Sequence, residues 1–156
     1  FLDEPTTGRD PQSRRQLWSL LDAVRRRGGT IVLTTHYMDE AQTLCDRVAI
    51  VDHGQVIALG SPRELIDSLG AGHVVEFAVE PGAAVGTGPL AALPGVRGVR
   101  ADGAAIHLRV AEHHVVIPAL LAELERQGLG LSQFATHHAT LEDVFVAHTG
   151  RHLRDE

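Results

Sequence analysis

The chain has 156 residues, of which 44% are hydrophobic and 22% are charged, and these values indicate a folded protein rather than a disordered one. Its net charge of −6 argues against general nucleic-acid binding, while the absence of lysine and the single cysteine exclude lysine chemistry and an internal disulfide. No apolar run reaches the roughly 18 residues that a membrane-spanning helix needs.

The first elements predict an α/β arrangement. Residues 1–2 are typical of the end of a buried strand, so we expect this chain to be the C-terminal part of a longer protein. Asp10 and Pro11 predict a helix start, with aspartate as the N-cap and proline in the first helical position. Residues 30–34 form a short, largely apolar and β-branched run, which predicts a strand buried on both faces of a parallel sheet. A second helix is expected over residues 38–45.

A hairpin and a short helix come next in the prediction. Residues 47–51 and 55–59 are two β-prone runs separated by a turn sequence that ends in glycine. Ser61 and Glu64 have the spacing of a capping box, which predicts a short helix that ends at Leu69. A glycine-rich stretch after this helix marks the expected domain boundary. The predicted domains are residues 1–70 and 73–150, followed by a tail over residues 151–156.

The second half of the chain predicts a small α+β domain. Its segments follow the order β-α-β-β-α-β, which is the order of a ferredoxin-like fold. The expected strands cover residues 73–80, 96–100, 105–110 and 129–136, and the expected helices lie near 90–93 and over 115–127. Thr140 has the character of an N-cap, and it predicts a closing helix over residues 141–148 that ends before Gly150.

Two adjacent carboxylates, Asp3 and Glu4, leave the first strand and enter a loop that contains glycine and proline. Ligands of α/β proteins bind outside the carboxyl ends of the strands, which is where these side chains lie. Asp3 is suited to hold a hydrated Mg²⁺, and Glu4 to orient or deprotonate a water molecule. His36 follows the second strand, so we expect it at the same edge if the two strands are neighbours. A histidine there can hydrogen-bond a phosphoryl group during its transfer.

Residues 1–11, Phe-Leu-Asp-Glu-Pro-Thr-Thr-Gly-Arg-Asp-Pro, resemble the Walker B motif and D-loop of ATP-binding-cassette (ABC) ATPases. Residues 34–41, Thr-Thr-His-Tyr-Met-Asp-Glu-Ala, are similar to the H-loop of these proteins, and residues 47–62 to the hairpin that follows it. Residues 139–151 resemble the C-terminal extension of ABC-2-type exporter ATPases, which include daunorubicin/doxorubicin-type drug-resistance subunits. The resemblance implies an α/β fold in which the C-terminal part of a P-loop ABC ATPase core precedes the small ferredoxin-like domain.

The resemblance also implies a role for each matching residue. Glu4 would be the catalytic carboxylate for water attack on the γ-phosphate of ATP, and His36 the switch histidine that senses this phosphate. Asp3 would serve the Mg²⁺ ion through water. Gly8 and Asp10 belong to the D-loop, which contacts the partner cassette across the bound nucleotide, and we count them among the cofactor-binding residues. ATP and Mg²⁺ are the expected cofactors.

The chain departs from the family pattern in what it lacks. The phosphate-binding loop, the Q-loop glutamine and the signature motif of the family are absent from the sequence. Because these motifs precede the Walker B strand in the family, truncation explains their absence, and we expect the chain alone to hydrolyse no ATP. Arg9 stands where the family usually has leucine, and its charge either alters the contact with the partner cassette or points into solvent.

The function implied for the parent protein is that of an ATP-hydrolysing subunit of an ABC exporter, which powers transport through a separate membrane permease. The expected partners are an ABC-2-type permease and a second nucleotide-binding domain, identical or not, and no nucleic acid. The expected location is the cytoplasm, peripherally on the inner face of the cell membrane. Two alternatives remain open: a non-enzymatic dimerisation or ligand-sensing module formed by residues 73–150, and a soluble ABC-type ATPase of DNA repair or translation.

Ten histidines raise the question of a metal site, with the pairs His113–His114 and His137–His138 as candidates. Adjacent histidines in a strand point to opposite faces of the sheet, so we expect neither pair to chelate a metal. Trp18 and Cys45 are expected to be packing residues.

Overall fold

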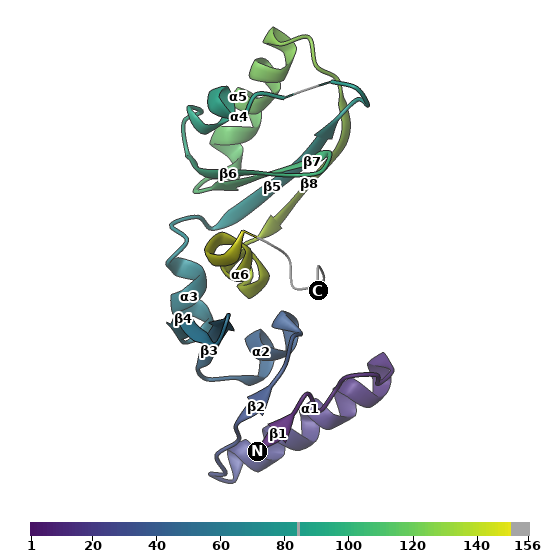
Figure 1. Ribbon diagram of the computed structural model, residues 1–156, viewed down its shortest axis with the longest axis vertical. Helices are drawn as coiled ribbons and strands as arrows, with labels where there is room; N and C mark the ends of the chain where they lie inside the picture. Colours follow the sequence, from purple (N-terminus) through teal and green to yellow (C-terminus); the bar gives the residue numbers. More distant parts are fainter. Residues whose placement is uncertain (84, 151–156) are drawn as a thin grey trace. The chain divides into compact units, whose positions relative to one another are not determined.

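The computed structural model describes residues 1–83 and 85–150, and its elements follow the predicted order (Figure 1). The described residues form two compact units, Phe1–Arg63 together with the segment from Thr140 onward, and Glu64–Ala139. The predicted tail over residues 151–156 lies outside the described residues, as does Arg151 of the resemblance to the exporter extension.

The N-terminal part of the first unit contains two short strands, two helices and a hairpin. Its elements up to the start of the second unit are β1 (Leu2–Asp3), α1 (Pro11–Arg26), β2 (Leu33–Thr34), α2 (Met38–Leu44), β3 (Val48–Asp52) and β4 (Gln55–Gly60). The helix α3 (Pro62–Asp67) starts at the predicted proline, and the chain then enters the sheet of the second unit. In β3 and β4 the predicted hairpin is confirmed, and its turn residues His53 and Gly54 have φ of 46° and 75°, the left-handed backbone of a type I′ turn.

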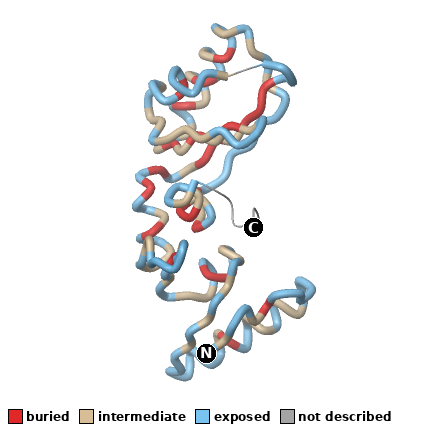
Figure 2. The backbone as a smooth tube through the Cα atoms, in the orientation of Figure 1, coloured by how far each residue is buried: buried red, intermediate tan, exposed pale blue. Residues whose placement is uncertain are grey.

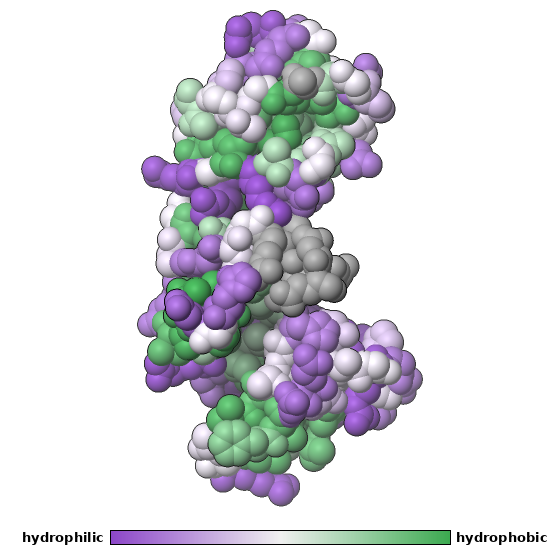
Figure 3. Space-filling view, in the orientation of Figure 1, coloured by the Kyte–Doolittle hydropathy of each residue, from purple (hydrophilic) through white to green (hydrophobic). Residues whose placement is uncertain are grey.

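The strands β1 and β2 pair in parallel, and Asp3 lies opposite Thr34. Two predictions for these strands are wrong. Phe1 is fully exposed, and residues 30–34 contain only a two-residue strand, next to Val32, which is 51% exposed. The reason is that, within the described ranges, β1 and β2 pair only with each other, so no neighbouring strand buries them. Apolar surface accordingly gathers at the lower end of the view in Figure 3, where Figure 1 places these strands.

The helix α1 begins where the sequence predicts. The Asp10 side chain accepts hydrogen bonds from two backbone N–H groups of the first turn, both at 3.0 Å, and Gly28 follows the helix with a left-handed φ of 84°. Leu21 is buried, whereas Leu20 and Val24 are 60% and 41% exposed. The predicted N-cap is therefore confirmed, but the apolar face of the helix is only partly covered.

The helix α6 (Leu141–Thr149) returns the chain to the first unit. The predicted N-cap is confirmed, because Thr140 and Asp143 form a reciprocal capping box in which the backbone N–H of Thr140 donates to the Asp143 carboxylate at 2.8 Å. The backbone N–H of Leu141 donates to Gln42 Oε1 of α2 at 3.1 Å. The predicted second domain, residues 73–150, contains this helix, whereas its packing against α2 groups it with the first unit.

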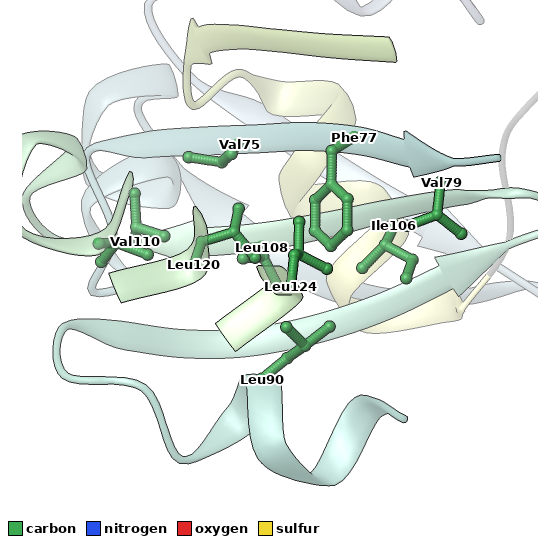
Figure 4. Packing of buried hydrophobic residues seen from close by; sticks show 10 residues of the cluster. Val75, Phe77, Val79, Leu90, Ile106, Leu108, Val110, Leu120 and Leu124 are labelled. Carbon is green, nitrogen blue, oxygen red and sulfur yellow. The ribbon is translucent and has the colours of Figure 1, made fainter. Parts of the chain in front are cut away.

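The second unit confirms the predicted order β-α-β-β-α-β. Its elements are β5 (His73–Val79), α4 (Thr87–Ala91), β6 (Val96–Asp102), β7 (Ala105–Val110), α5 (His113–Arg126) and β8 (Leu131–His138). The four strands form one antiparallel sheet in the order β6-β7-β5-β8. The alternate residues of β5 and β7 that face the helices form the core with α4 and α5, as Figure 4 shows for Phe77, Leu108 and Leu120. Figure 2 shows how strongly burial follows β5.

Candidate functional site

Asp3 and Glu4 lie where β1 ends, beside the end of β2, as the sequence predicts. The Thr34 hydroxyl donates a short hydrogen bond to Asp3 Oδ1. The backbone N–H of Glu4 donates to the Thr34 carbonyl oxygen at 3.0 Å, so the parallel pairing continues to the first residue of the loop. Thr34 therefore holds both acidic residues in place, a role that the sequence analysis did not assign to it.

The imidazole of His36 contacts the Glu4 side chain. His36 Nδ1 lies 3.1 Å from Glu4 Oε1, and the two side chains are 42% and 46% exposed. Because an ionised carboxylate can only accept hydrogen bonds, His36 carries its proton on Nδ1 when it makes this contact. The second oxygen, Glu4 Oε2, accepts a hydrogen bond from the Thr7 hydroxyl at 3.0 Å. The predicted meeting of Glu4 and His36 is confirmed, and both remain open to a ligand.

The loop after β1 turns sharply at Glu4. Its φ of 40° lies in the left-handed region, which costs a residue other than glycine roughly 1–3 kcal/mol. Gly8 adopts a φ of 73° in the same loop without this cost. Arg9 is exposed, and its Nε donates to the Pro5 carbonyl oxygen at 3.0 Å. Arg9, which departs from the family pattern, thus points into solvent and bridges the two ends of the loop segment from Pro5 to Arg9.

Asp10 has a structural task at the end of this loop. Its Oδ1 accepts the backbone N–H groups of Gln12 and Ser13, and its Oδ2 accepts the Ser13 hydroxyl at 2.5 Å. The hydrogen bonds from Ser13 hold the pKa of Asp10 below its ordinary value. Both oxygens are engaged by the first turn of α1, so the side chain of Asp10 shapes the loop.

A buried carboxylate that the sequence analysis did not single out lies next to this loop. Glu40 of α2 is fully buried, and its Oε2 accepts a hydrogen bond from the hydroxyl of Thr6, which is 1% exposed, at 3.1 Å. Its Oε1 accepts the indole N–H of Trp18 at 2.9 Å. Trp18 is thus a hydrogen-bond donor as well as a packing residue. Cys45 is half-buried, and burial raises the pKa of its thiol, as suits a packing residue.

A cavity of about 770 Å³ opens beside His36. Thr34, Thr35 and His36 line one part of it. The rest is lined by residues 29–33 and 45–47, by side chains of α1, α2, β3 and β4, and by Phe145 of α6, most of them apolar. All of these residues belong to the first unit. The two-stranded sheet is therefore flanked by an apolar space large enough for several side chains of another segment.

The acidic residues of the site fit a magnesium ion that keeps most of its water. Asp3 and Thr34 bring a carboxylate and a hydroxyl together, and Mg²⁺ prefers such hard oxygen donors. Among residues 1–83 and 85–150, no three histidine, cysteine, aspartate or glutamate side chains converge so as to hold a metal. A magnesium ion at Asp3 would therefore take its other ligands from water and from a bound phosphate.

The histidines of the second unit form a cluster that the sequence analysis missed. The His73 ring lies 4.4 Å from the His113 ring and 4.6 Å from the His138 ring, between centroids. The argument from adjacent strand residues does not apply to His113 and His114, because both belong to α5. The pair at the end of β8 does lie in a strand, where His138 pairs with His73 in the sheet. The cluster thus joins residues that are distant in sequence.

We expect this cluster to make the second unit less stable in acid. Burial lowers the pKa of His73, and His113 and His138 lower it further, while Glu112 acts in the opposite direction. The pKa of His73 in the folded chain lies below the unfolded value of 6.5. The stability that depends on a neutral His73 is therefore fully present above pH 6.5 and is lost as the pH falls through the folded pKa. Urea unfolding of the chain, followed by circular dichroism at pH 7.5 and 5.5, should therefore show a lower midpoint in acid.

In the His73→Gln variant this decrease should be smaller than in the wild type. His148, which is exposed on α6 in the first unit, provides the matched control, and His148→Gln should keep the full decrease. An equal decrease in the wild type and in His73→Gln would contradict this prediction.

Comparisons with known proteins cover nearly the whole chain. The chain is 40% identical to the daunorubicin/doxorubicin resistance ATP-binding protein DrrA of Streptomyces peucetius, over 99% of this chain and 47% of that protein. It is 37% identical to the Nod factor export ATP-binding protein I of Ralstonia nicotianae, over 99% of the chain and 47% of that protein. It is 33% identical to the linearmycin resistance ATP-binding protein LnrL of Bacillus subtilis, over 99% and 50%. The chain thus spans about half the length of the curated relatives it matches.

A family model extends the same relationship through the second unit and α6. Residues 60–149 match the family described as ATP-binding protein DrrA1-3-like, C-terminal domain. No helix in the described part of the chain has both the length and the apolar character to cross a membrane. This matched segment lies after the loops that carry Glu4 and His36. The relatives match the chain over these loops and over the segment that follows them. The chain therefore belongs to the DrrA-like family of ABC transporter ATP-binding proteins.

Proposed function

We propose that this chain supplies part of the ATP-hydrolysing site of an ABC exporter subunit. The observation that carries the proposal is the contact between His36 Nδ1 and Glu4 Oε1 at the shared edge of β1 and β2. Reactions of this class depend on a residue that positions water and on groups that stabilise the transferred phosphoryl group. A carboxylate and a histidine held together at the carboxyl ends of parallel strands suit both tasks.

The proposed roles follow from the hydrogen bonds of each side chain. Glu4 is held by Thr7 through one oxygen and by His36 through the other, so its carboxylate has a fixed orientation toward an attacking water. With Nδ1 donating to Glu4, the other ring nitrogen of His36, Nε2, is free of that contact. When Nε2 also carries a proton, its N–H can donate to a phosphate oxygen. Asp3 would hold Mg²⁺ through water, and a bound ion would supply positive charge that offsets the negative charge of the phosphates. Gly8 and Asp10 shape the loop that faces a second cassette.

The architecture proposed for the parent protein places residues 1–70 in a P-loop ATPase core and residues 73–150 in an accessory domain. The exposed apolar side chains of Phe1 and Val32, just before β1 and β2, and of Leu20 and Val24 on α1 support a core that further chain would cover. The apolar cavity beside His36 supports the same conclusion. The length of the relatives supports this as well, since each is about twice as long as the chain. The element order and the strand order β6-β7-β5-β8 support a ferredoxin-like fold for the accessory domain.

The partners proposed for the parent protein are a second nucleotide-binding domain and an ABC-2-type membrane permease. The names of the relatives, which are resistance and export ATP-binding proteins, support a role in export. The proposed location is the cytoplasmic face of the cell membrane, where such a subunit binds its permease. The substrate is left open, because the relatives differ in the compounds for which they are named.

The test is to compare the full-length protein with this 156-residue chain. We expect the full-length protein to hydrolyse ATP in the presence of Mg²⁺ and the chain alone to hydrolyse none, because the chain contains no phosphate-binding loop. A tagged full-length protein should also copurify with a membrane permease. Hydrolysis by the chain alone, or a full-length protein without any nucleotide hydrolysis, would refute the proposal.

A further inference from the structure

Glu40 is a buried carboxylate that none of the proposed catalytic steps uses. It is 0% exposed, and a carboxylate in such a place destabilises a fold unless hydrogen bonds replace its hydration. Both of its oxygens are satisfied, Oε2 by the Thr6 hydroxyl at 3.1 Å and Oε1 by the Trp18 indole at 2.9 Å. These two donors come from different parts of the first unit, so the carboxylate links segments that are distant in sequence.

The three linked segments are those that carry or flank the catalytic pair. Thr6 lies two residues after Glu4, in the strained turn that follows β1. Glu40 lies in the first turn of α2, four residues after His36. Trp18 comes from α1, to which the loop leads. The Thr6–Glu40 hydrogen bond therefore connects the loop that contains Glu4 directly to α2, the helix that begins two residues after His36.

A second contact supports the same alignment from the surface. Arg14 of α1 forms an ion pair with Asp39 of α2 at 3.2 Å and stacks over the Tyr37 ring at 4.5 Å. The Tyr37 ring in turn lies 4.2 Å from the His36 ring, between centroids. Asp39 is 63% exposed, so this ion pair contributes little by itself. The buried hydrogen bonds of Glu40 are the stronger constraint.

We propose that Glu40 is a positioning residue, which sets the contact between His36 and Glu4 by tying the Thr6 turn to α2. This inference rests on the proposed function, because it assigns to Glu40 the alignment of the catalytic pair. The backbone strain at Glu4 explains why this hydrogen bond is needed. A glutamate with left-handed backbone angles persists only where surrounding contacts hold it in that conformation. Without the tie, Glu4 relaxes and the fixed approach of its carboxylate to His36 Nδ1 is lost.

Substitutions at Glu40 and Thr6 can separate the effect of the hydrogen bonds from the effects of charge and of packing. In Glu40→Gln the amide oxygen can accept the Trp18 N–H while the amide NH₂ donates to Thr6, whose hydroxyl can also accept. This variant therefore keeps both links with one of them reversed. Glu40→Leu fills the space but has no acceptor, and Thr6→Val removes only the hydroxyl. Ser19→Ala is the control, because Ser19 bonds to the Arg15 carbonyl on the exposed side of α1.

The first readout is the imidazole tautomer of His36, measured by ¹⁵N NMR of the labelled chain at a pH where the ring is neutral. The wild type, Glu40→Gln and Ser19→Ala should carry the proton on Nδ1, as the contact with Glu4 requires. Thr6→Val and Glu40→Leu should shift the ring toward the Nε2–H form. The His36→Gln variant assigns the signal. Retention of the Nδ1–H form in Thr6→Val and Glu40→Leu, or its loss in a folded Glu40→Gln, would overturn the inference.

The second readout is ATP hydrolysis by the full-length protein that carries the same changes. Thr6→Val should lower kcat about 10-fold with little change in KM, because the catalytic groups are present but misaligned. Glu40→Gln should restore most of the rate. Unchanged kcat in Thr6→Val would overturn the inference, and if Glu40→Leu does not fold, Thr6→Val alone decides. A tautomer shift in the variants of the chain, together with a full-length protein that has no ATPase activity, would refute the proposed function and leave the positioning role supported.

Discussion

Replacing Glu4 by glutamine in the full-length protein is expected to lower kcat for ATP hydrolysis by at least about 100-fold. A glutamine oxygen can still accept the hydrogen bond from Thr7, and the side chain keeps its size, so the loop should retain its shape. What is lost is the carboxylate that orients and deprotonates water. Nucleotide affinity should therefore stay within about threefold of the wild type, since the change affects the reaction and not the binding of the ground state.

Steady-state hydrolysis and equilibrium binding of a fluorescent ATP analogue would measure the two quantities separately. Glu125→Gln provides the control, because Glu125 is exposed on α5 of the second unit and the same change of charge there should leave both quantities unaltered. A Glu4→Gln variant with nearly normal kcat would show that another group positions the water. Loss of affinity together with kcat would indicate that the loop had lost its structure.

The largest effect on stability is expected for Phe77→Ala in the second unit. Phe77 is 0% exposed and lies in the core between β5 and the helices, beside Ile106 and Leu124 (Figure 4). Truncation of such a residue removes its apolar contacts and leaves a cavity, which lowers the free energy of unfolding by about 3–5 kcal/mol. Because the single tryptophan, Trp18, lies in the first unit, urea unfolding should be followed by circular dichroism rather than by fluorescence.

The same sheet offers a matched control for this experiment. Phe134 of β8 lies directly opposite Phe77 in the register of the sheet, but it is 43% exposed. Phe134→Ala should therefore lower the free energy of unfolding by less than about 1.5 kcal/mol, because part of its surface is already in water. Equal losses for the two variants would mean that Phe77 is not the centre of the core that its burial indicates.

The sequence was sufficient to predict the features that depend on local chemistry. A few neighbouring residues are enough to predict the helix caps at Asp10 and Thr140 and the hairpin turn before Gln55. The same holds for the order of elements in the second unit. Glu4 and His36 could be brought together because two strands that end in polar residues predict a shared edge when they are neighbours.

Features that depend on distant contacts could not be predicted in this way. Glu40 has the pattern of an ordinary acidic residue in the first turn of a helix, and only the approach of Thr6 and Trp18 shows why it is buried. The His73 cluster joins three separate elements, none of which signals it alone. The burial expected for Phe1 and its neighbours was wrong because an apolar run indicates what a strand prefers, not whether a neighbouring strand is present.

The ends of the sheet in the second unit lie side by side. The backbone N–H of Ala139, just after β8, donates to the carbonyl oxygen of Gly72, just before β5, at 3.1 Å. The segment that begins and ends there is therefore built as an insertion, whose removal would leave two chain ends close enough to be joined by a short linker. A chain in which a short linker replaces this segment would keep α6 in the first unit, where the backbone N–H of Leu141 donates to Gln42.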